Sequence, residues 1–180
     1  MTGIAGLCQL SEEIPRHTVT LGFGVGSPQG RFAQYDRFLT RPALLMDYEF
    51  RLHRYFAADA GVDLVFRADN DQCFAPRGCP PPKPGGQAWL VPFGARVLVP
   101  VRSDSIELFV GGGGAKASYE YFQRYLDNGW GGQANAGFRI RFGASRRWHA
   151  GFLGRYYRIP NRSYLKEQWF TLFGSAGVAF

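Results

Sequence analysis

The chain alternates apolar and polar positions over most of its length, with the period of two that is typical of β-strands. At the C-terminal end, Phe170, Leu172, Val178 and Phe180 fall on one face, and polar or small residues fall on the other. The same alternation recurs in segments 18–26, 46–52, 56–66, 89–101, 106–110, 134–142 and 148–156. The pattern predicts about eight antiparallel strands, each with one apolar face.

The connections between these segments alternate between long and short. Segments 27–41, 68–87, 119–131 and 160–166 are long and polar or rich in glycine and proline, whereas 53–54, 102–105 and 144–147 are brief reversals. This rhythm is typical of an up-and-down barrel with long loops at one end. Pro92 and Pro100 interrupt their strand, so a bulge or register adjustment is expected there. The run from Gly111 to Gly114 lacks the spacing of a phosphate-binding loop and is expected to let the barrel wall bend.

The length of 180 residues is consistent with one domain, which we expect to consist of a tail over 1–17 and a barrel over 18–180. Hydrophobic residues make up 46% of the chain, but the mean hydropathy is only −0.20, because apolar and polar residues are interleaved. No apolar run reaches the roughly 18 residues that a transmembrane helix needs.

The polar face of the predicted strands carries many charges: Asp47, Glu49, Arg51, Asp59, Asp63, Arg67, Arg96, Glu107, Arg139, Arg141 and Arg155. A soluble barrel turns its apolar face inward, whereas a membrane barrel turns that face toward lipid. Isolated charges in a narrow interior are costly, but paired ones are accommodated. Because the apolar face is aromatic on nearly every strand, we expect a membrane barrel whose interior charges pair into a plug. A soluble ligand-binding barrel is the less favoured alternative.

The net charge of +7 and the isoelectric point of 9.6 raise the question of nucleic-acid binding. The basic residues are scattered among loops, strands and turns, whereas a nucleic-acid interface requires a contiguous basic patch. We therefore expect no nucleic-acid partner. Anionic lipid headgroups or lipopolysaccharide phosphates fit basic residues at a membrane rim better.

Two of the three cysteines, Cys73 and Cys79, lie in one proline- and glycine-rich segment. We expect a disulfide that closes this short loop, which implies an oxidising compartment. A zinc site is the alternative, but no further Cys or His stands nearby at ligand spacing. Cys8 stands alone near the N-terminus and is expected to be free. The sequence predicts no metal and no cofactor.

The alternation, the rhythm of the connections, the charged inner face and the terminal Phe180 together resemble the small outer-membrane β-barrels of Gram-negative bacteria, the OmpA-transmembrane and OmpX type. The resemblance covers residues 18–180 and is architectural. It implies an outer-membrane location, contact with outer-membrane lipid and lipopolysaccharide, and a terminal aromatic residue that signals to the barrel-assembly machinery. The function it implies is structural or surface interaction, in adhesion or envelope integrity.

Rigid barrels carry their recognition residues on loops. Aromatic and arginine side chains suit contact with an extracellular protein or with lipopolysaccharide. The candidates for such contacts are Arg31, Tyr35, Arg37, Tyr121, Arg124 and Trp130. An interfacial aromatic belt with solvated loop tips is the alternative interpretation.

An enzymatic role is the second hypothesis, because outer-membrane lipid A deacylases share this architecture and use a serine, a histidine and an acid. Ser163 and Glu167 lie in or near the last long segment, whereas the histidines His17, His53 and His149 lie beside the short turns or the tail. His149 would be about 30 Å from the serine along a strand. A general base must lie within hydrogen-bond reach of its nucleophile, so we expect no catalytic site.

Overall fold

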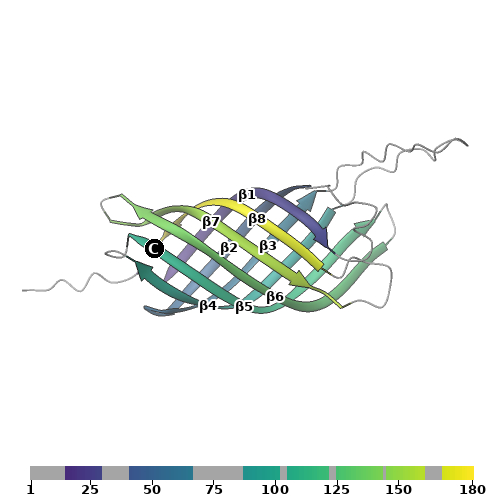
Figure 1. Cartoon of the computed structure of the whole chain (residues 1–180), viewed down its shortest axis with the longest axis horizontal. Coiled ribbons are helices and arrows are strands. Elements are labelled where there is room, and N and C mark those ends of the chain that lie inside the picture. Colours follow the sequence, from purple (N-terminus) through teal and green to yellow (C-terminus); the bar gives the residue numbers. More distant parts are fainter. Residues whose placement is uncertain are drawn as a thin grey trace, which may run out of the picture.

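The computed structural model describes residues 15–29, 41–66, 87–101, 105–121, 125–143, 145–160 and 168–180. Within them, eight antiparallel strands form one closed barrel, in which each strand pairs with its neighbours in sequence and β1 pairs with β8 (Figure 1). The strands are β1 His17–Gln29, β2 Arg41–His53, β3 Phe56–Phe66, β4 Gln87–Val101, β5 Ile106–Tyr121, β6 Tyr125–Phe142, β7 Trp148–Arg158 and β8 Gln168–Ala179. The barrel predicted from the alternation is confirmed. No helix in these residues is long and apolar enough to cross a membrane.

The strand register closes the barrel with a stagger of ten residues. Successive cross-strand partners lead from Thr18 of β1 to Glu49, Asp59, Gly94, Gly113, Gln133, Tyr157 and Trp169, and return to β1 at Pro28. On eight strands, this stagger corresponds to a strand tilt of about 40°. A barrel of this size has an interior just wide enough for side chains to fill, so residues from opposite walls meet.

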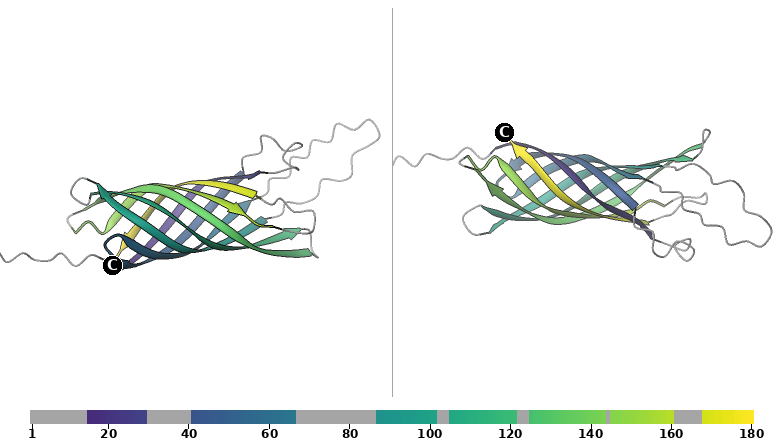
Figure 2. Two further views of the ribbon diagram at one scale, coloured as in Figure 1. Left: turned by 60° about the horizontal axis from the view of Figure 1, so that its bottom comes forward. Right: turned by 90° about the horizontal axis from the view of Figure 1, so that it is seen from above.

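The two ends of the barrel differ. The short connections that follow β2, β4 and β6 lie at one end together with the C-terminus, and we call it the turn end (Figure 2). Strands β1, β3, β5 and β7 finish at the opposite end, which we call the loop end. The predicted alternation of connections therefore corresponds to the two ends of one barrel, except that the connection between β5 and β6 at the loop end is short.

The terminal strand joins directly onto the first. The backbone N–H of His17 donates to the carbonyl of Phe180 at 3.0 Å, and the N–H of Phe180 donates to the carbonyl of His17 at 2.8 Å. The two rings stack with their centroids 5.6 Å apart, and Nδ1 of His17 lies 2.7 Å from the Tyr48 hydroxyl. Phe180 therefore completes the seam between β1 and β8.

The segment 119–131, predicted to be a long loop, is mostly strand. β5 runs to Tyr121 and β6 starts at Tyr125, and these two residues pair with each other. The prediction was wrong because the polar and glycine residues of this segment read locally as a loop, whereas pairing across the hairpin extends both strands. β5 and β6 are accordingly the longest described strands, with 16 and 18 residues.

The bulge or register adjustment expected at Pro92 and Pro100 is not found. β4 keeps one register with β5 along its whole length, and one register with β3 on both sides of Pro92. The β3–β4 pairs at Pro92 and its neighbour drop out of the ladder, as expected for a residue without an N–H group. The β2–β3 ladder instead shifts register between Arg51 and His53, beside the first tight turn.

Glycine is required where β6 approaches its neighbours closely. A Cβ atom on Gly137 would collide with the carbonyl oxygen of Phe152 on β7 and with the ring of Phe109 on β5. A Cβ atom on Gly154 of β7 would meet its nearest neighbour, the carbonyl oxygen of Ala136, at an ordinary 3.8 Å. The two positions therefore differ in the space available for a side chain.

Replacing Gly137 by alanine is expected to lower the free energy of unfolding by about 1–3 kcal/mol, because the added methyl group forces the wall or the Phe109 ring to move. Gly154→Ala is the matched control and is expected to leave stability unchanged or slightly higher. Urea unfolding in one detergent, followed by tryptophan fluorescence, measures both. Equal stability of the two variants would contradict the close approach at Gly137.

Candidate functional site: the charged interior and the apolar belt

The outer wall of the barrel is apolar and exposed. Phe23 is 66% exposed, Leu21 60% and Phe180 59%. The same face continues around the barrel with Met46, Phe56, Phe93, Val110, Phe142, Trp148 and Phe152. We call this surface the apolar belt, and its residues are those that the alternation predicted to share the apolar face. Lipid is the environment that covers an apolar surface around a closed barrel.

The interior holds a network of opposite charges, which we call the interior network. It connects Asp47, Glu49, Asp59, Asp63 and Glu107 with Arg51, Arg96, Arg139, Arg141 and Arg155. All of these side chains are buried except that of Arg141, which is 10% exposed. The charged interior predicted from the polar face is confirmed. Acids and arginines are equal in number here, and this balance allows the charges to be buried.

Glu107 organises the part of the network nearest the turn end. Its Oε2 accepts a hydrogen bond from Nη2 of Arg51 at 2.6 Å, and its Oε1 accepts one from Nε of Arg139 at 2.6 Å. Nη2 of Arg141 lies 3.4 Å from Oε2. Arg139 then extends the network, because its Nη2 lies 2.6 Å from Oε1 of Glu49.

Arg96 of β4 continues the network through three acids. Its Nη1 lies 3.5 Å from Oε2 of Glu49 and 2.7 Å from Oδ2 of Asp47. Its Nη2 lies 3.1 Å from Oδ2 of Asp59. The Phe109 ring packs against the guanidinium group, with its centroid 5.1 Å from Cζ, which adds a cation–π contact.

Asp63 and Arg155 form the part of the network nearest the loop end. Nη1 of Arg155 donates to Oδ1 of Asp63 at 2.6 Å, and its Nη2 pairs with Asp47. Oδ2 of Asp63 also accepts hydrogen bonds from the hydroxyls of Tyr157, at 2.6 Å, and Thr171, at 3.2 Å. Asp63 is 0% and Arg155 1% exposed. Charges so completely removed from water depend on these partners for their stability.

The network crosses the barrel from wall to wall. Arg139 on β6 reaches Glu49 on β2, and these strands stand on opposite walls of the eight-stranded barrel. The ion pairs therefore occupy the centre of the interior. Carboxylates held by several arginines are positioned as ion-pair partners, so the geometry favours a structural plug over acid–base chemistry.

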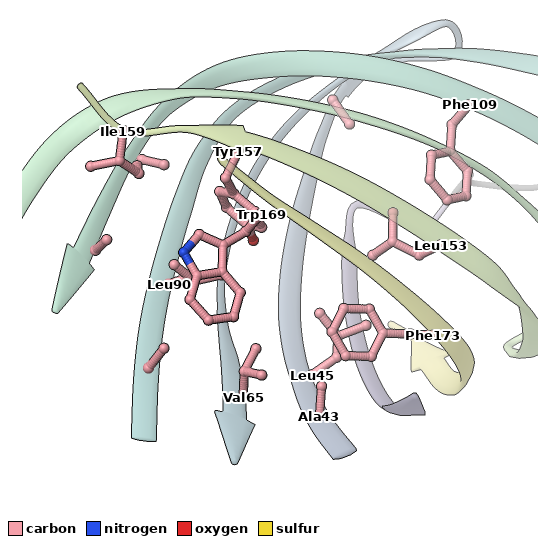
Figure 3. Packing of buried hydrophobic residues seen from close by; sticks show 14 of the residues in the cluster. Ala43, Leu45, Val65, Leu90, Phe109, Leu153, Tyr157, Ile159, Trp169 and Phe173 are labelled. Carbon is pink, nitrogen blue, oxygen red and sulfur yellow. The ribbon is translucent and has the colours of Figure 1, made fainter. Parts of the chain in front are cut away.

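An apolar layer, which the sequence did not lead us to expect, lies between the network and the loop end. Its inward-pointing side chains include Leu45, Val65, Leu90, Ile159 and Trp169 (Figure 3). Several of these residues stand in runs that are apolar on both faces, such as 44–46, 64–66 and 89–91. A period of two does not tell in such a run which residue points inward. Most of the large buried apolar side chains thus lie toward the loop end, while Leu98 and Phe109 are buried nearer the turn end.

The histidine that the lipid A deacylase hypothesis requires lies at the turn end of the barrel, far from the end where β7 finishes. His149 lies near the start of β7, at the turn end, where it is buried and its Nε2 lies 3.0 Å from the Thr20 hydroxyl. Ser163 and Glu167 lie outside the described residues, in the connection that follows β7. The loop end of β7 is about 30 Å from its start. The described residues therefore give that hypothesis no general base.

The remaining predicted site residues divide into two groups. Arg31, Tyr35, Arg37, Arg67, Cys73, Cys79 and Arg124 lie outside the described residues. Tyr121 is the last residue of β5. Trp130, expected on a loop, lies in β6 with a side chain that is 64% exposed on the outer wall. This correction follows from the extended β5–β6 hairpin, which places Trp130 on the barrel wall.

Comparison with solved structures identifies small outer-membrane barrels as similar folds. Neisserial surface protein A (NspA) matches with a TM-score of 0.63 at 10% sequence identity, over 91% of this chain and 97% of that chain. The outer membrane protein OprG of Pseudomonas aeruginosa gives 0.62 at 10%, over 91% and 95%. Ail, the attachment invasion locus protein of Yersinia pestis, gives 0.55 at 11%, over 93% and 100%. Ail has also been solved in complex with the heparin analogue sucrose octasulfate.

No protein-family model and no curated protein sequence matches the chain. At these low identities, the structural matches establish the fold, which is that of a small outer-membrane β-barrel of the OmpA and OmpX type.

Proposed function

We propose that this protein is a bacterial outer-membrane barrel with a structural and surface-interaction role, in which the barrel is an anchor and the loop end makes the contacts. The observation that supports it best is the combination of an apolar belt around the barrel with a network of ion pairs across its centre. The belt suits a bilayer, and the filled interior suits an anchor better than a solute channel.

The loop end is the part of the molecule available for recognition. The long connections there carry aromatic and basic residues, among them Arg31, Tyr35 and Arg37. Arginines beside aromatic side chains suit an anionic partner, since guanidinium groups bind sulfate and phosphate in a bidentate manner. The likeness to Ail, solved with a heparin analogue, supports a sulfated polysaccharide as the first probe.

The test uses the whole chain folded into liposomes. These liposomes are expected to bind immobilised heparin and to remain as impermeable to small sugars as protein-free liposomes. The double variant Arg31→Gln/Arg37→Gln is expected to weaken heparin binding several-fold and to make the remaining binding less sensitive to salt, because fewer charge-based contacts are left to be screened. Unaltered binding by this variant would contradict the proposed contact, and sugar leakage would contradict the role as a closed anchor.

A further inference from the structure

The outward face of the described strands carries two cationic side chains, Lys116 of β5 and Arg158 of β7, and both are exposed. Their strands are separated by β6 alone, where Trp130 pairs with Lys116 and Gly132 pairs with Arg158. Two strand spacings and an offset of two residues along the strands therefore put the backbones of the two cations about 12 Å apart across the wall. A cation on the lipid-facing surface of a barrel is strongly destabilising at the bilayer centre and costs little near the headgroups.

The height of these cations along the barrel matches the edge of a membrane. Lys116 is ten residues along β5 from Ile106, and Arg158 is ten residues along β7 from Trp148. At a strand tilt of about 40°, ten residues rise roughly 25 Å, which is the height of the lipid-facing band in such barrels. Both cations therefore lie at the loop-end boundary of the apolar belt, where lipid headgroups begin.

Aromatic rings hold one of these cations in place. Nζ of Lys116 lies 5.6 Å from the centroid of the Trp130 ring. The Phe93 ring lies across Gly114, where any Cβ atom would collide with it, and meets the Trp130 ring edge-on at a centroid distance of 6.2 Å. The absence of a side chain at Gly114 thus allows Phe93 to support the tryptophan that positions the lysine.

A floor of small residues extends from the cations toward the membrane interior. Gly114 pairs with Gly132, and one row further from the loop end Gly112 pairs with Ala134. A Cβ atom on Gly132 would meet its nearest neighbour at 3.6 Å, so the space above Gly132 is open, whereas the Phe93 ring covers Gly114. Tyr156 pairs with Ala134 on the far side and borders the floor. An acyl chain fits such a shallow apolar floor between aromatic side chains.

We propose that Lys116, Trp130 and Arg158 form a binding site on the outer wall for a phosphorylated glycolipid of the outer leaflet, with lipid A as its chemical class. The two cations bind a phosphate on the sugar headgroup, and one acyl chain lies over Gly132 and the floor beneath it. The charges point to an anionic headgroup, and the position at the loop end points to the outer leaflet. This inference rests on the proposed outer-membrane location.

Native mass spectrometry of the detergent-solubilised protein, titrated with diphosphoryl lipid A, tests the site. The wild-type chain is expected to retain lipid A, and Lys116→Gln/Arg158→Gln is expected to bind it roughly thirtyfold more weakly, since each basic residue at a charged membrane surface contributes a five- to sixfold gain. Arg147→Gln removes an exposed cation at the turn end and is the matched control, expected to bind like wild type. Gly132→Leu keeps both cations but places a large side chain where the acyl chain would lie, and it is therefore expected to weaken lipid A binding as well.

Three further measurements distinguish the ways in which the proposal could fail. Titration with phosphatidylglycerol is expected to give weaker binding, and equal retention of that phospholipid would overturn the assignment to a glycolipid. Unchanged lipid A affinity in the double variant, with heat-modifiable gel migration intact, would overturn the site and leave the proposed location standing. Full solubility of the wild-type chain without detergent would overturn the location itself.

Discussion

Replacing Asp63 by alanine is expected to lower the free energy of unfolding by about 3–5 kcal/mol, because it removes one of the acidic partners of a fully buried arginine. Arg155 donates to Asp63 from the opposite side of the barrel, and it has no access to water that could replace the lost carboxylate. The Tyr157 hydroxyl loses its acceptor in the same step. Urea unfolding of the lipid-reconstituted protein measures the effect.

Two further variants separate charge from hydrogen bonding. Thr171→Val removes one neutral donor to Asp63 and is expected to cost about 1 kcal/mol. Asp63→Leu combined with Arg155→Leu removes both charges, while Asp47 keeps Arg96 as a partner. This double variant is expected to be more stable than Asp63→Ala, because no uncompensated charge remains. If Asp63→Ala cost no more than Thr171→Val, the interior network would not hold the barrel together.

Replacing Phe23 by arginine is expected to destabilise the barrel in a bilayer by about 2–4 kcal/mol, because it places a charge on the lipid-facing wall near the bilayer centre. Phe23 lies about midway along β1 and is 66% exposed. In a soluble barrel the same change would be harmless, since an exposed arginine is well hydrated. The variant therefore distinguishes the two environments.

Leu52→Arg is the matched control for Phe23→Arg. Leu52 is 67% exposed but lies beside the first tight turn, at the edge of the apolar belt. Its replacement is expected to cost about 0–1 kcal/mol, because an arginine there reaches the headgroups. Unfolding of both variants in the same liposomes measures the difference. Equal costs at the two depths would contradict a bilayer around the belt.

Much of the barrel followed from local pattern alone. The outward positions of Phe23, Phe93 and Phe152 were predictable because a strand turns successive side chains to opposite faces. The same rule placed Glu49 and Arg139 inside. It did not reveal which acid meets which arginine, since that depends on the stagger with which the barrel closes.

The failures have a common origin in pairing between distant segments. The hairpin that carries Tyr121 and Trp130 was predicted to be a loop. Its strands are extended by pairing with each other, and their own composition does not indicate this. The tolerance of Pro92 also comes from its neighbours, since β5 holds β4 in one register past the missing donor. Neither effect is visible in a single strand.

The sequence by itself determined the number of strands, the residues on each of their two faces and the charged residues that point inside, because each depends on a period of two within one segment. The tertiary structure decided which charges pair, where the apolar layer lies and how Lys116, Trp130 and Arg158 come together on the wall. The physical reason is closure. A closed barrel brings side chains from distant segments into contact, and only the shared stagger and tilt of all eight strands set those meetings.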